Sequence, residues 1–243
     1  MPRIIHASDL HGSLYKLPEA DLYIITGDVL PNFPDIVQVQ SGRMDDFGHF
    51  GGGLTRKITP EKEERLQNEW FKRKFAKKKR SLRYFLGSPE APVVVVRGNH
   101  DFTPLAPMFG GEVYEIGDPC LSYNVCGLDI GGFRGINYIE GEWADETDPS
   151  EFYNILRKVP TDLDVMVTHS PPLNILDGKF DERWGVQAYA AWITEQLYDD
   201  DKGPLPKLFC FGHIHNDYNM LEWDDGTIFS NAATSHRMIS LNV

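Results

Sequence analysis

The chain has 243 residues, of which 41% are hydrophobic and 25% are charged, and its formal net charge at neutral pH is −12. This length and apolar content are sufficient for a substantial core and predict one domain over residues 1–243. The acidic charge argues against binding of nucleic acid by the whole surface, because such binding requires neutralisation of phosphates. No apolar stretch approaches the ~20 residues of a membrane span, and the N-terminal residues lack a signal-peptide pattern. We therefore expect a cytoplasmic protein without membrane contact.

Short apolar runs predict buried strands at five places along the chain. In chain order they are residues 4–5, 23–25, 93–96, 165–167 and 208–211. Each run is followed by polar residues that can bind metals. The first loop residues after a buried strand are held rigidly while their side chains face a cavity. We therefore predict that the five strand ends converge on one rim.

A basic amphipathic helix is predicted between the second and third strands, over residues 60–86 and ending near Gly87. Thr59 is the expected N-cap and Pro60 the first helical residue. In a βαβ unit this helix is the crossover, so its N-terminal end should lie nearest to the strand ends. Two interpretations of its many lysines and arginines remain open. They form a solvated face, or they contact nucleic acid or another acidic partner.

The C-terminal half predicts two further helices and a β-hairpin. The helices are expected over residues 149–159 and 182–198, with Trp184 and Trp192 of the second on a stripe that faces the core. Alternating residues between 218 and 231 surround an Asp-Asp-Gly sequence, which is typical of a hairpin.

Two kinds of residue are expected to be structural. The three cysteines, Cys120, Cys126 and Cys210, lack the spacing of a disulfide framework or a metal site, so we expect them to be reduced and mostly buried. His6 lies inside the first predicted strand, and we expect it to be a hydrogen-bonded core residue.

The polar blocks after the strands have the composition of a metal site. They are Asp9-Leu10-His11, Gly27-Asp28, Gly98-Asn99-His100-Asp101, His169 and Gly212-His213-Ile214-His215. Carboxylate and amide oxygens beside neutral imidazoles suit borderline divalent ions such as Mn²⁺, Zn²⁺ or Fe²⁺. A glycine before the ligands lets the backbone turn sharply close to a metal. Each block alone is common in turns, but the combination favours a metal site.

The order of these blocks, D-x-H, GD, GNH-D/E, H and GH-x-H, resembles that of the calcineurin-like metallophosphoesterase superfamily. This resemblance implies an α/β fold, a four-layer α/β/β/α sandwich with two central mixed β-sheets. It also implies a pair of divalent metal ions, with Mn²⁺ expected and Fe/Zn or Ni²⁺ as alternatives. By the resemblance, the ligands are Asp9, His11 and His215 on one ion, Asn99, His169 and His213 on the other, and Asp28 as the bridge.

Such a centre hydrolyses phosphoesters. Two cations about 3.5–4 Å apart hold a bridging hydroxide in line with the phosphorus and neutralise the phosphoryl oxygens. His100 is next to Asn99 but is not needed as a ligand, so it can protonate the leaving oxygen. Asp101 could orient the His100 ring by accepting its Nδ1 proton. We therefore predict His100 and Asp101 as catalytic residues.

Two loops could contribute to substrate binding. Residues 29–58 are rich in Gly and Pro and carry Phe33, which could stack on a base or ring, so this segment is either a substrate lid or a disordered surface loop. Arg134 lies in a second loop, over residues 131–138, and could contact a substrate phosphate. An exposed arginine in a turn is the alternative interpretation.

The resemblance also separates classes of substrate. Phosphoprotein phosphatases extend the second block to GD-x-x-DRG, whereas Asp28 is followed here by Val-Leu-Pro-Asn. The GNHD and Gly-His-Ile-His blocks are similar to those of small phosphodiesterase-like members, including class III cyclic-nucleotide phosphodiesterases. We therefore predict hydrolysis of a cyclic nucleotide or another nucleotide or nucleic-acid diester. The alternatives are a phosphomonoesterase acting on a nucleotide or small phosphate, a nuclease, and a non-enzymatic metal-binding interaction scaffold.

Overall fold

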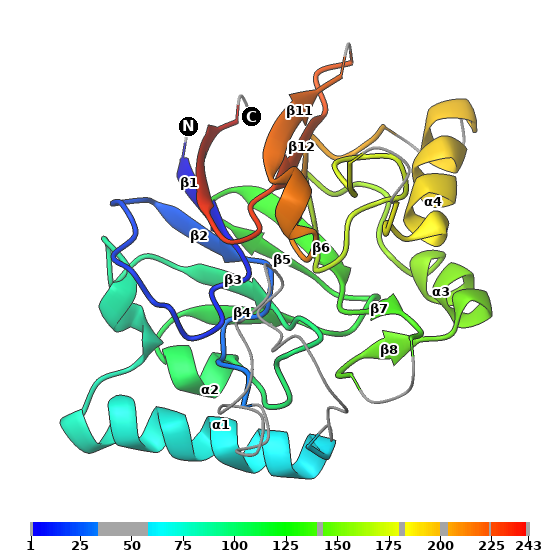
Figure 1. The fold of residues 1–243 in the computed structure, drawn as a ribbon. Coiled ribbons are helices and arrows are strands. Elements are labelled where there is room, and N and C mark those ends of the chain that lie inside the picture. The colour runs from blue at the N-terminus through cyan, green and yellow to red at the C-terminus, as the bar shows by residue number, and fades with distance from the viewer. Residues whose placement is uncertain are drawn as a thin grey trace.

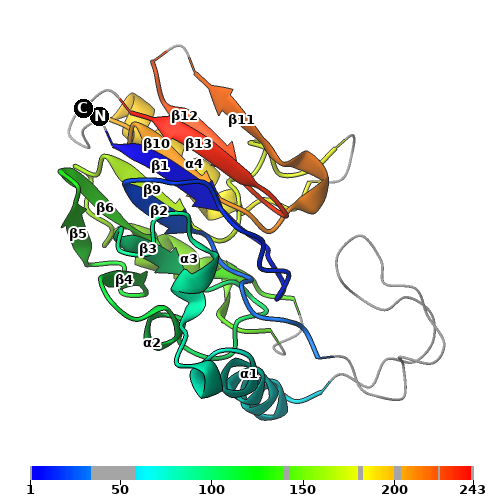
Figure 2. The same ribbon diagram turned by 90° about the vertical axis from the view of Figure 1, so that its left-hand side faces the viewer.

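The computed structural model describes residues 2–33, 58–139, 143–179, 183–199, 204–223 and 225–241. Within these ranges the chain forms two large mixed β-sheets that pack face to face, with helices on their outer faces (Figures 1 and 2). The proposed lid falls largely on residues 34–57, which lie outside the described residues.

The first sheet has the strand order β13-β1-β2-β3-β4. Its strands are β1 (Arg3–Ala7), β2 (Leu22–Ile25), β3 (Val93–Val96), β4 (Val113–Ile116) and β13 (His236–Ser240). Strands β1 to β4 are parallel, and β13 joins the edge antiparallel to β1. Every residue of β2 and β3 is buried, because central parallel strands are covered on both faces. This explains why both strands are continuous apolar runs in the sequence.

The second sheet has the order β11-β12-β10-β9-β6-β5. Its strands are β5 (Ser122–Val125), β6 (Leu128–Phe133), β9 (Val165–Thr168), β10 (Leu208–Phe211), β11 (Asn219–Glu222) and β12 (Ile228–Asn231). The antiparallel pair of β11 and β12 confirms the predicted hairpin. A short parallel ribbon of β7 (Ile136–Asn137) and β8 (Glu146–Thr147) follows β6.

The helices complete a four-layer sandwich and confirm the predicted fold class. The first sheet is covered by α1 (Pro60–Lys74), η2 (Ala76–Lys78), η3 (Leu82–Phe85) and α2 (Ala106–Phe109). The second is covered by α3 (Pro149–Leu156) and α4 (Gln187–Tyr198), at the right of Figure 1, and η4 (His215–Asp217) follows β10. Because side chains alternate along a strand, Ile5 packs toward α1 whereas Ile4 packs between the sheets. Among the described residues, no helix combines the length and apolar character that a membrane crossing needs.

Helix α1 is shorter than predicted. It begins at Pro60, and the Thr59 hydroxyl accepts a hydrogen bond from the backbone of Lys62 at 3.4 Å, as expected of an N-cap. It ends at Lys74 and not near residue 87, and Lys79 then adopts a left-handed φ of 54°, so the chain continues in 3₁₀ turns.

Arg83 is not part of the basic surface that the sequence predicted. Its guanidinium is largely buried and donates hydrogen bonds to backbone carbonyl oxygens, including those of Pro89 at 2.7 Å and Ala91 at 2.6 Å. Because it also donates to the carbonyl oxygens of Gly110 and Glu112, the side chain connects the segment before β3 to the segment before β4.

The two helices predicted in the C-terminal half are present, but their boundaries differ from the prediction. Helix α4 begins at Gln187 and not at residue 182, so Trp184 precedes it and is 61% exposed, whereas Trp192 is buried as predicted. Helix α3 ends at Leu156, three residues before the predicted boundary at 159.

Of the cysteines, Cys210 is buried, but Cys120 and Cys126 are exposed and correct the prediction that they are mostly buried. His6 is the predicted core residue, with ring nitrogens 2.8 Å from the Ser230 hydroxyl and 2.9 Å from the Thr26 hydroxyl.

Candidate metal centre

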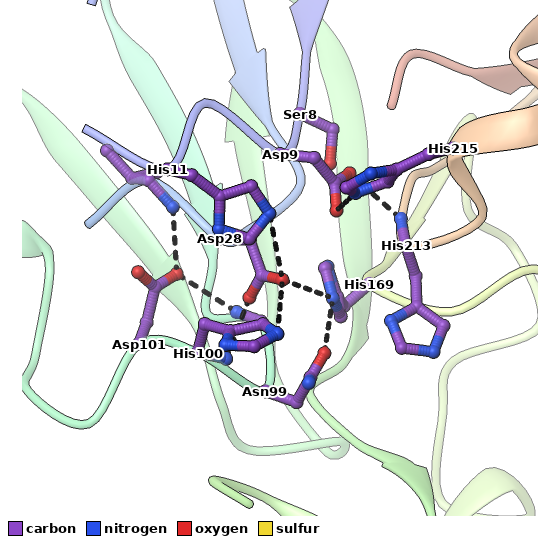
Figure 3. A network of polar contacts seen from close by, with 12 residues as sticks. Ser8, Asp9, His11, Asp28, Asn99, His100, Asp101, His169, His213 and His215 are labelled. Carbon is purple, nitrogen blue, oxygen red and sulfur yellow. Dashed lines mark hydrogen bonds and ion pairs between the residues drawn. The ribbon is translucent and has the colours of Figure 1, made fainter. Parts of the chain in front are cut away.

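The predicted metal ligands meet where strands of the two sheets end. Strands β1, β2, β3, β9 and β10 each lead into one of the polar blocks. Figure 3 shows side chains from all five blocks pointing toward a common centre. The tertiary structure therefore brings together all seven predicted ligands and His100, although they are up to about two hundred residues apart in sequence.

One group of ligand atoms surrounds Asp9. Its Oδ1 atom lies 3.1 Å from His215 Nε2, and its Oδ2 atom accepts a hydrogen bond from the His213 backbone at 2.8 Å. Asp9, His11 and His215 have ligand atoms within 4.8 Å of one another. Both ring nitrogens of His11 are buried without a hydrogen-bond partner in the described part of the chain. Because an unpaired buried imidazole is unfavourable, this ring fits a metal ligand better than a core residue.

Asp28 lies between this group and the second one. Its Oδ2 atom is 3.5 Å from His169 Nε2 and 3.8 Å from His11 Nε2. Asp9, Asp28 and His169 form a second set of ligand atoms within 4.8 Å of one another. The other oxygen of Asp28 accepts a hydrogen bond from the His100 backbone at 2.8 Å. This position suits a bridging carboxylate.

His169 is oriented by the backbone of β2. Its Nδ1 atom lies 2.6 Å from the carbonyl oxygen of Thr26, so Nδ1 donates and Nε2 faces the centre, 3.0 Å from Asn99 Oδ1. Burial opposes a charged ring, but the carboxylate of Asp28 outweighs it and raises the pKa of His169 to about 9. The site thus favours positive charge at Nε2, which a proton or a metal ion supplies.

The remaining charges also suit cation binding. Burial would raise the pKa of Asp9, but the hydrogen bond with His215 and the charge of His169 lower it to about 2. Burial likewise opposes ionisation of Asp28, yet the neighbouring histidines hold its pKa well below the usual value. Burial lowers the pKa of His213 to about 4. At neutral pH the carboxylates are therefore charged and His213 is neutral, as metal ligation requires.

The ligand loops have an unusual backbone. Asp9, His11, Asp28 and His213 all have left-handed φ angles, of 54°, 42°, 51° and 69°. Such angles are uncommon for residues other than glycine and cluster at functional sites. Hydrogen bonds between the loops support them, including one from His11 N to Asp28 O at 2.8 Å.

The glycines before the predicted ligands are required by close contacts with protein atoms. A Cβ atom at Gly98 would overlap the carboxylate of Asp28. One at Gly212 would overlap the side chains of Ser8 and Asp9. Neither position therefore has room for a larger residue unless the ligands move.

His100 lies at the edge of the centre, with its Nε2 atom 3.9 Å from Asp28 Oδ2. Its ring centroid is 5.1 Å from that of His11 and 4.7 Å from that of Trp143. No local pattern in the sequence pointed to Trp143, because its contact with His100 is made between distant segments.

Asp101 has different partners from those predicted. Its buried carboxylate accepts hydrogen bonds from the backbone of Leu30 at 3.0 Å, Gly98 at 3.1 Å and Val29 at 3.3 Å. Its hydrogen bonds thus go to the backbone and not to the His100 ring, which corrects the expected orienting role. Burial and the Asp28 carboxylate raise the pKa of Asp101 to about 7. Asp101 joins the loop after Asp28 to the loop that carries Asn99.

Sequence reasoning also missed Gln67. This residue of α1 is buried, and its Nε2 atom donates to the His100 carbonyl at 2.5 Å while its Oε1 atom accepts from Phe102 N at 3.0 Å. The sequence pattern of α1 could have indicated that Gln67 lies on the buried face of the helix. It could not have indicated the hydrogen-bond partners of Gln67, because these depend on how α1 packs against the first sheet.

The two predicted substrate contacts have partners within the protein. Arg134 Nε lies 3.3 Å from Asp145 Oδ1, beside the ribbon of β7 and β8. The backbone N–H of Phe33 donates to Glu63 on α1 at 2.9 Å. Substrate contact by either residue stays a prediction.

Residues 2–217 match the model of the calcineurin-like phosphoesterase family, and the chain therefore belongs to this family. Its candidate ligand groups agree with that membership.

Two individual proteins are similar to the chain. It is 35% identical over 81 residues to the UPF0046 protein K07C11.7 of Caenorhabditis elegans. The aligned stretch is 33% of this chain and spans 25% of the length of that curated relative. The crystal structure of TT1561 of Thermus thermophilus matches with a TM-score of 0.51 at 11% identity, covering 95% of this chain and 88% of that one. At this identity the second match supports the fold alone.

Proposed function

We propose that this protein hydrolyses a phosphodiester, either a cyclic nucleotide or another nucleotide or nucleic-acid diester. The reaction would use two bound divalent metal ions, which we expect to be Mn²⁺. The observation that carries the proposal is the position of Asp28, whose Oδ2 atom lies within 3.9 Å of the Nε2 atoms of His11, His100 and His169. One carboxylate thus faces both ligand groups and the candidate acid.

The residues divide into two ligand groups that share Asp28. Asp9, His11 and His215, whose ligand atoms lie together, would hold one ion. Asn99, His169 and His213, on the other side of Asp28 in Figure 3, would hold the second. When bound, two such ions neutralise the phosphoryl oxygens and lower the pKa of water from ~16 toward ~7. The ionised carboxylates and the Nδ1–H bond of His169 keep the ligand atoms turned toward the centre.

His100 supplies the proton in this proposal. Its Nε2 atom faces the centre and lies 3.9 Å from Asp28 Oδ2. From Nε2 the proton passes to the leaving alkoxide as the P–O bond breaks, which leaves a neutral imidazole. Gln67 and Asp28 hold the backbone of His100 from opposite directions, through its carbonyl and its N–H.

The charges around the centre favour a diester over a monoester. A phosphomonoester dianion carries more negative charge than a diester and is usually bound with additional arginines or lysines. Among the described residues, the two arginines nearest to these loops, Arg97 and Arg134, are already paired, because Asp145 Oδ1 lies 3.0 Å from Arg97 and 3.3 Å from Arg134, and Glu115 Oε1 lies 3.9 Å from Arg97. Their charge is therefore largely compensated, which supports a singly charged substrate group.

The test compares two chromogenic substrates in the presence of Mn²⁺. We expect faster hydrolysis of bis(p-nitrophenyl) phosphate than of p-nitrophenyl phosphate. Cyclic nucleotides, linear dinucleotides, single-stranded nucleic acid and nucleoside monophosphates then identify the natural class. Hydrolysis confined to monoesters would overturn the diester proposal. Two bound metals without hydrolysis of any member would instead support an interaction scaffold.

A further inference from the structure

A cavity of about 380 Å³ lies where the C-terminal end of α1 meets η2 and η3, and it contains none of the predicted metal ligands. Its apolar walls include Leu14, Phe75 and Phe85. The two phenylalanines belong to the core between α1 and the first sheet and are at most 4% exposed. The cavity is therefore a recess over a buried aromatic floor, and its volume is inside the range of ~300–1,000 Å³ that is common for small-molecule sites.

Four cations line the same cavity. They are Lys16, Lys74, Lys78 and Arg80. In the part of the chain that the structure describes, none of them forms an ion pair with a carboxylate. This is unexpected in a chain with 36 acidic and 24 basic residues.

The hydrogen bonds of these cations leave their charge uncompensated. Lys16 Nζ donates to the carbonyl oxygen of Leu86 at 2.5 Å, and Lys74 Nζ donates to that of Gly12 at 3.4 Å. A lysine in the last turn of a helix is favoured by the helix dipole, which accounts for Lys74. It does not account for Lys16 or Arg80, because they lie outside the helix. An anion bound among these like charges would offset the repulsion between them.

An aromatic platform stands beside these charges. The guanidinium carbon of Arg80 lies 4.3 Å from the ring centroid of Tyr84, and Tyr84 is 58% exposed. An arginine over a tyrosine ring and the exposed ring itself offer flat surfaces on which a planar ring can pack. The cavity thus combines surfaces for a flat ring with positive charge for an anionic group.

We propose that this cavity binds a nucleoside phosphate, with the base against the Tyr84 platform and the phosphate among the lysines. The inference concerns a separate site from the metal centre and does not depend on which phosphoester is hydrolysed there. One hydrogen bond links the cavity to the segment that carries a predicted metal ligand. Lys74 of the cavity donates to the carbonyl oxygen of Gly12, and Gly12 directly follows the predicted ligand His11 in sequence.

The experiment is calorimetric titration of the full chain, loaded with Mn²⁺, with adenosine monophosphate and with ribose 5-phosphate. The second ligand keeps the sugar and the phosphate but lacks the flat base. The test variant is Lys78→Glu with Arg80→Glu. The matched control is Lys72→Glu with Lys77→Glu, which makes the same charge change at exposed residues outside the cavity. A third variant, Tyr84→Ala, removes the platform.

We expect the test variant to weaken binding of adenosine monophosphate by about tenfold or more, since charge-assisted phosphate contacts are lost, and the control to weaken it much less. Tyr84→Ala should reduce the affinity for adenosine monophosphate toward that for ribose 5-phosphate. Equal losses of affinity for adenosine monophosphate in the test and control variants would overturn the proposal. Such a result would mean that the ligand responds to the overall positive charge of this surface and not to the cavity.

Two other outcomes would also overturn it. Binding that EDTA abolishes and that the test variant leaves intact would assign the nucleotide to the metal centre. Binding of single-stranded RNA, but not of adenosine monophosphate, at the same residues would make the basic segment a nucleic-acid surface. None of these results depends on hydrolytic activity, so failure here is distinguishable from failure of the proposed diesterase function.

Discussion

Gln67 on α1 donates a hydrogen bond from Nε2 to the backbone carbonyl of His100 at 2.5 Å. The same side chain accepts a hydrogen bond from the backbone of Phe102, so one buried residue holds both sides of the loop that carries His100 and Asp101. Helix α1 therefore does more than connect β2 to β3. It holds the candidate acid His100 in place beside the predicted ligand Asn99.

Replacing Gln67 with Ala should lower kcat by roughly 10- to 100-fold, because small displacements of a catalytic group have effects of that size. Metal content should be unchanged, since Gln67 touches no predicted ligand side chain. Steady-state kinetics and metal analysis test both statements. Glu64→Ala, an exposed change on the same helix, is the control. A loss of thermal stability with unchanged kcat would restrict Gln67 to a structural role.

His100→Ala should retain both metals and lose activity by about 10²–10⁴-fold on a diester with a poor leaving group, because that alkoxide needs a proton. The loss should be much smaller for bis(p-nitrophenyl) phosphate, since p-nitrophenolate leaves readily without protonation. Comparing kcat for the two substrates in the wild type and the variant measures the difference. Equal losses on both substrates would contradict the role of His100 as general acid.

Asp28→Ala should lose metal binding, because this carboxylate faces both ligand groups. Isothermal titration with Mn²⁺ and metal analysis after dialysis measure the effect. Asp21→Ala removes a half-exposed carboxylate that pairs with Arg3 and should bind metal normally. Full metal occupancy in Asp28→Ala would rule out the bridging position.

The stability of the protein should depend on the ionisation of Glu63. Burial raises the pKa of this side chain from 4.5 to about 7, although its hydrogen bond from Phe33 N opposes the shift. A carboxyl with a raised pKa in the folded state contributes stability below pH 4.5, and that contribution is lost as pH rises toward 7. Urea midpoints of the wild type should therefore decline across this range relative to those of Glu63→Gln. Parallel pH profiles for the two proteins would contradict the prediction.

The sequence by itself determined the five strands and the metal-ligand blocks that follow them. Buried parallel strands need continuous apolar residues, and metal ligation needs carboxylates, amides and imidazoles directly after them, so both leave local patterns. The glycines were predictable for the same reason, since the close approach at Gly98 and Gly212 requires a residue without a Cβ atom.

Only the tertiary structure decided the contacts between segments that are distant in sequence. The carboxylate of Asp101 binds the backbone near Asp28, Gln67 reaches the loop of His100, and the guanidinium of Arg83 is enclosed by carbonyl groups. These partners depend on how α1 and the turns after it dock on the first sheet. The cavity around Tyr84 arises in the same way, because its walls come from residues 14–16 and 74–85. Local pattern predicts which residues can bind or pack, whereas docking of the elements determines what each side chain meets.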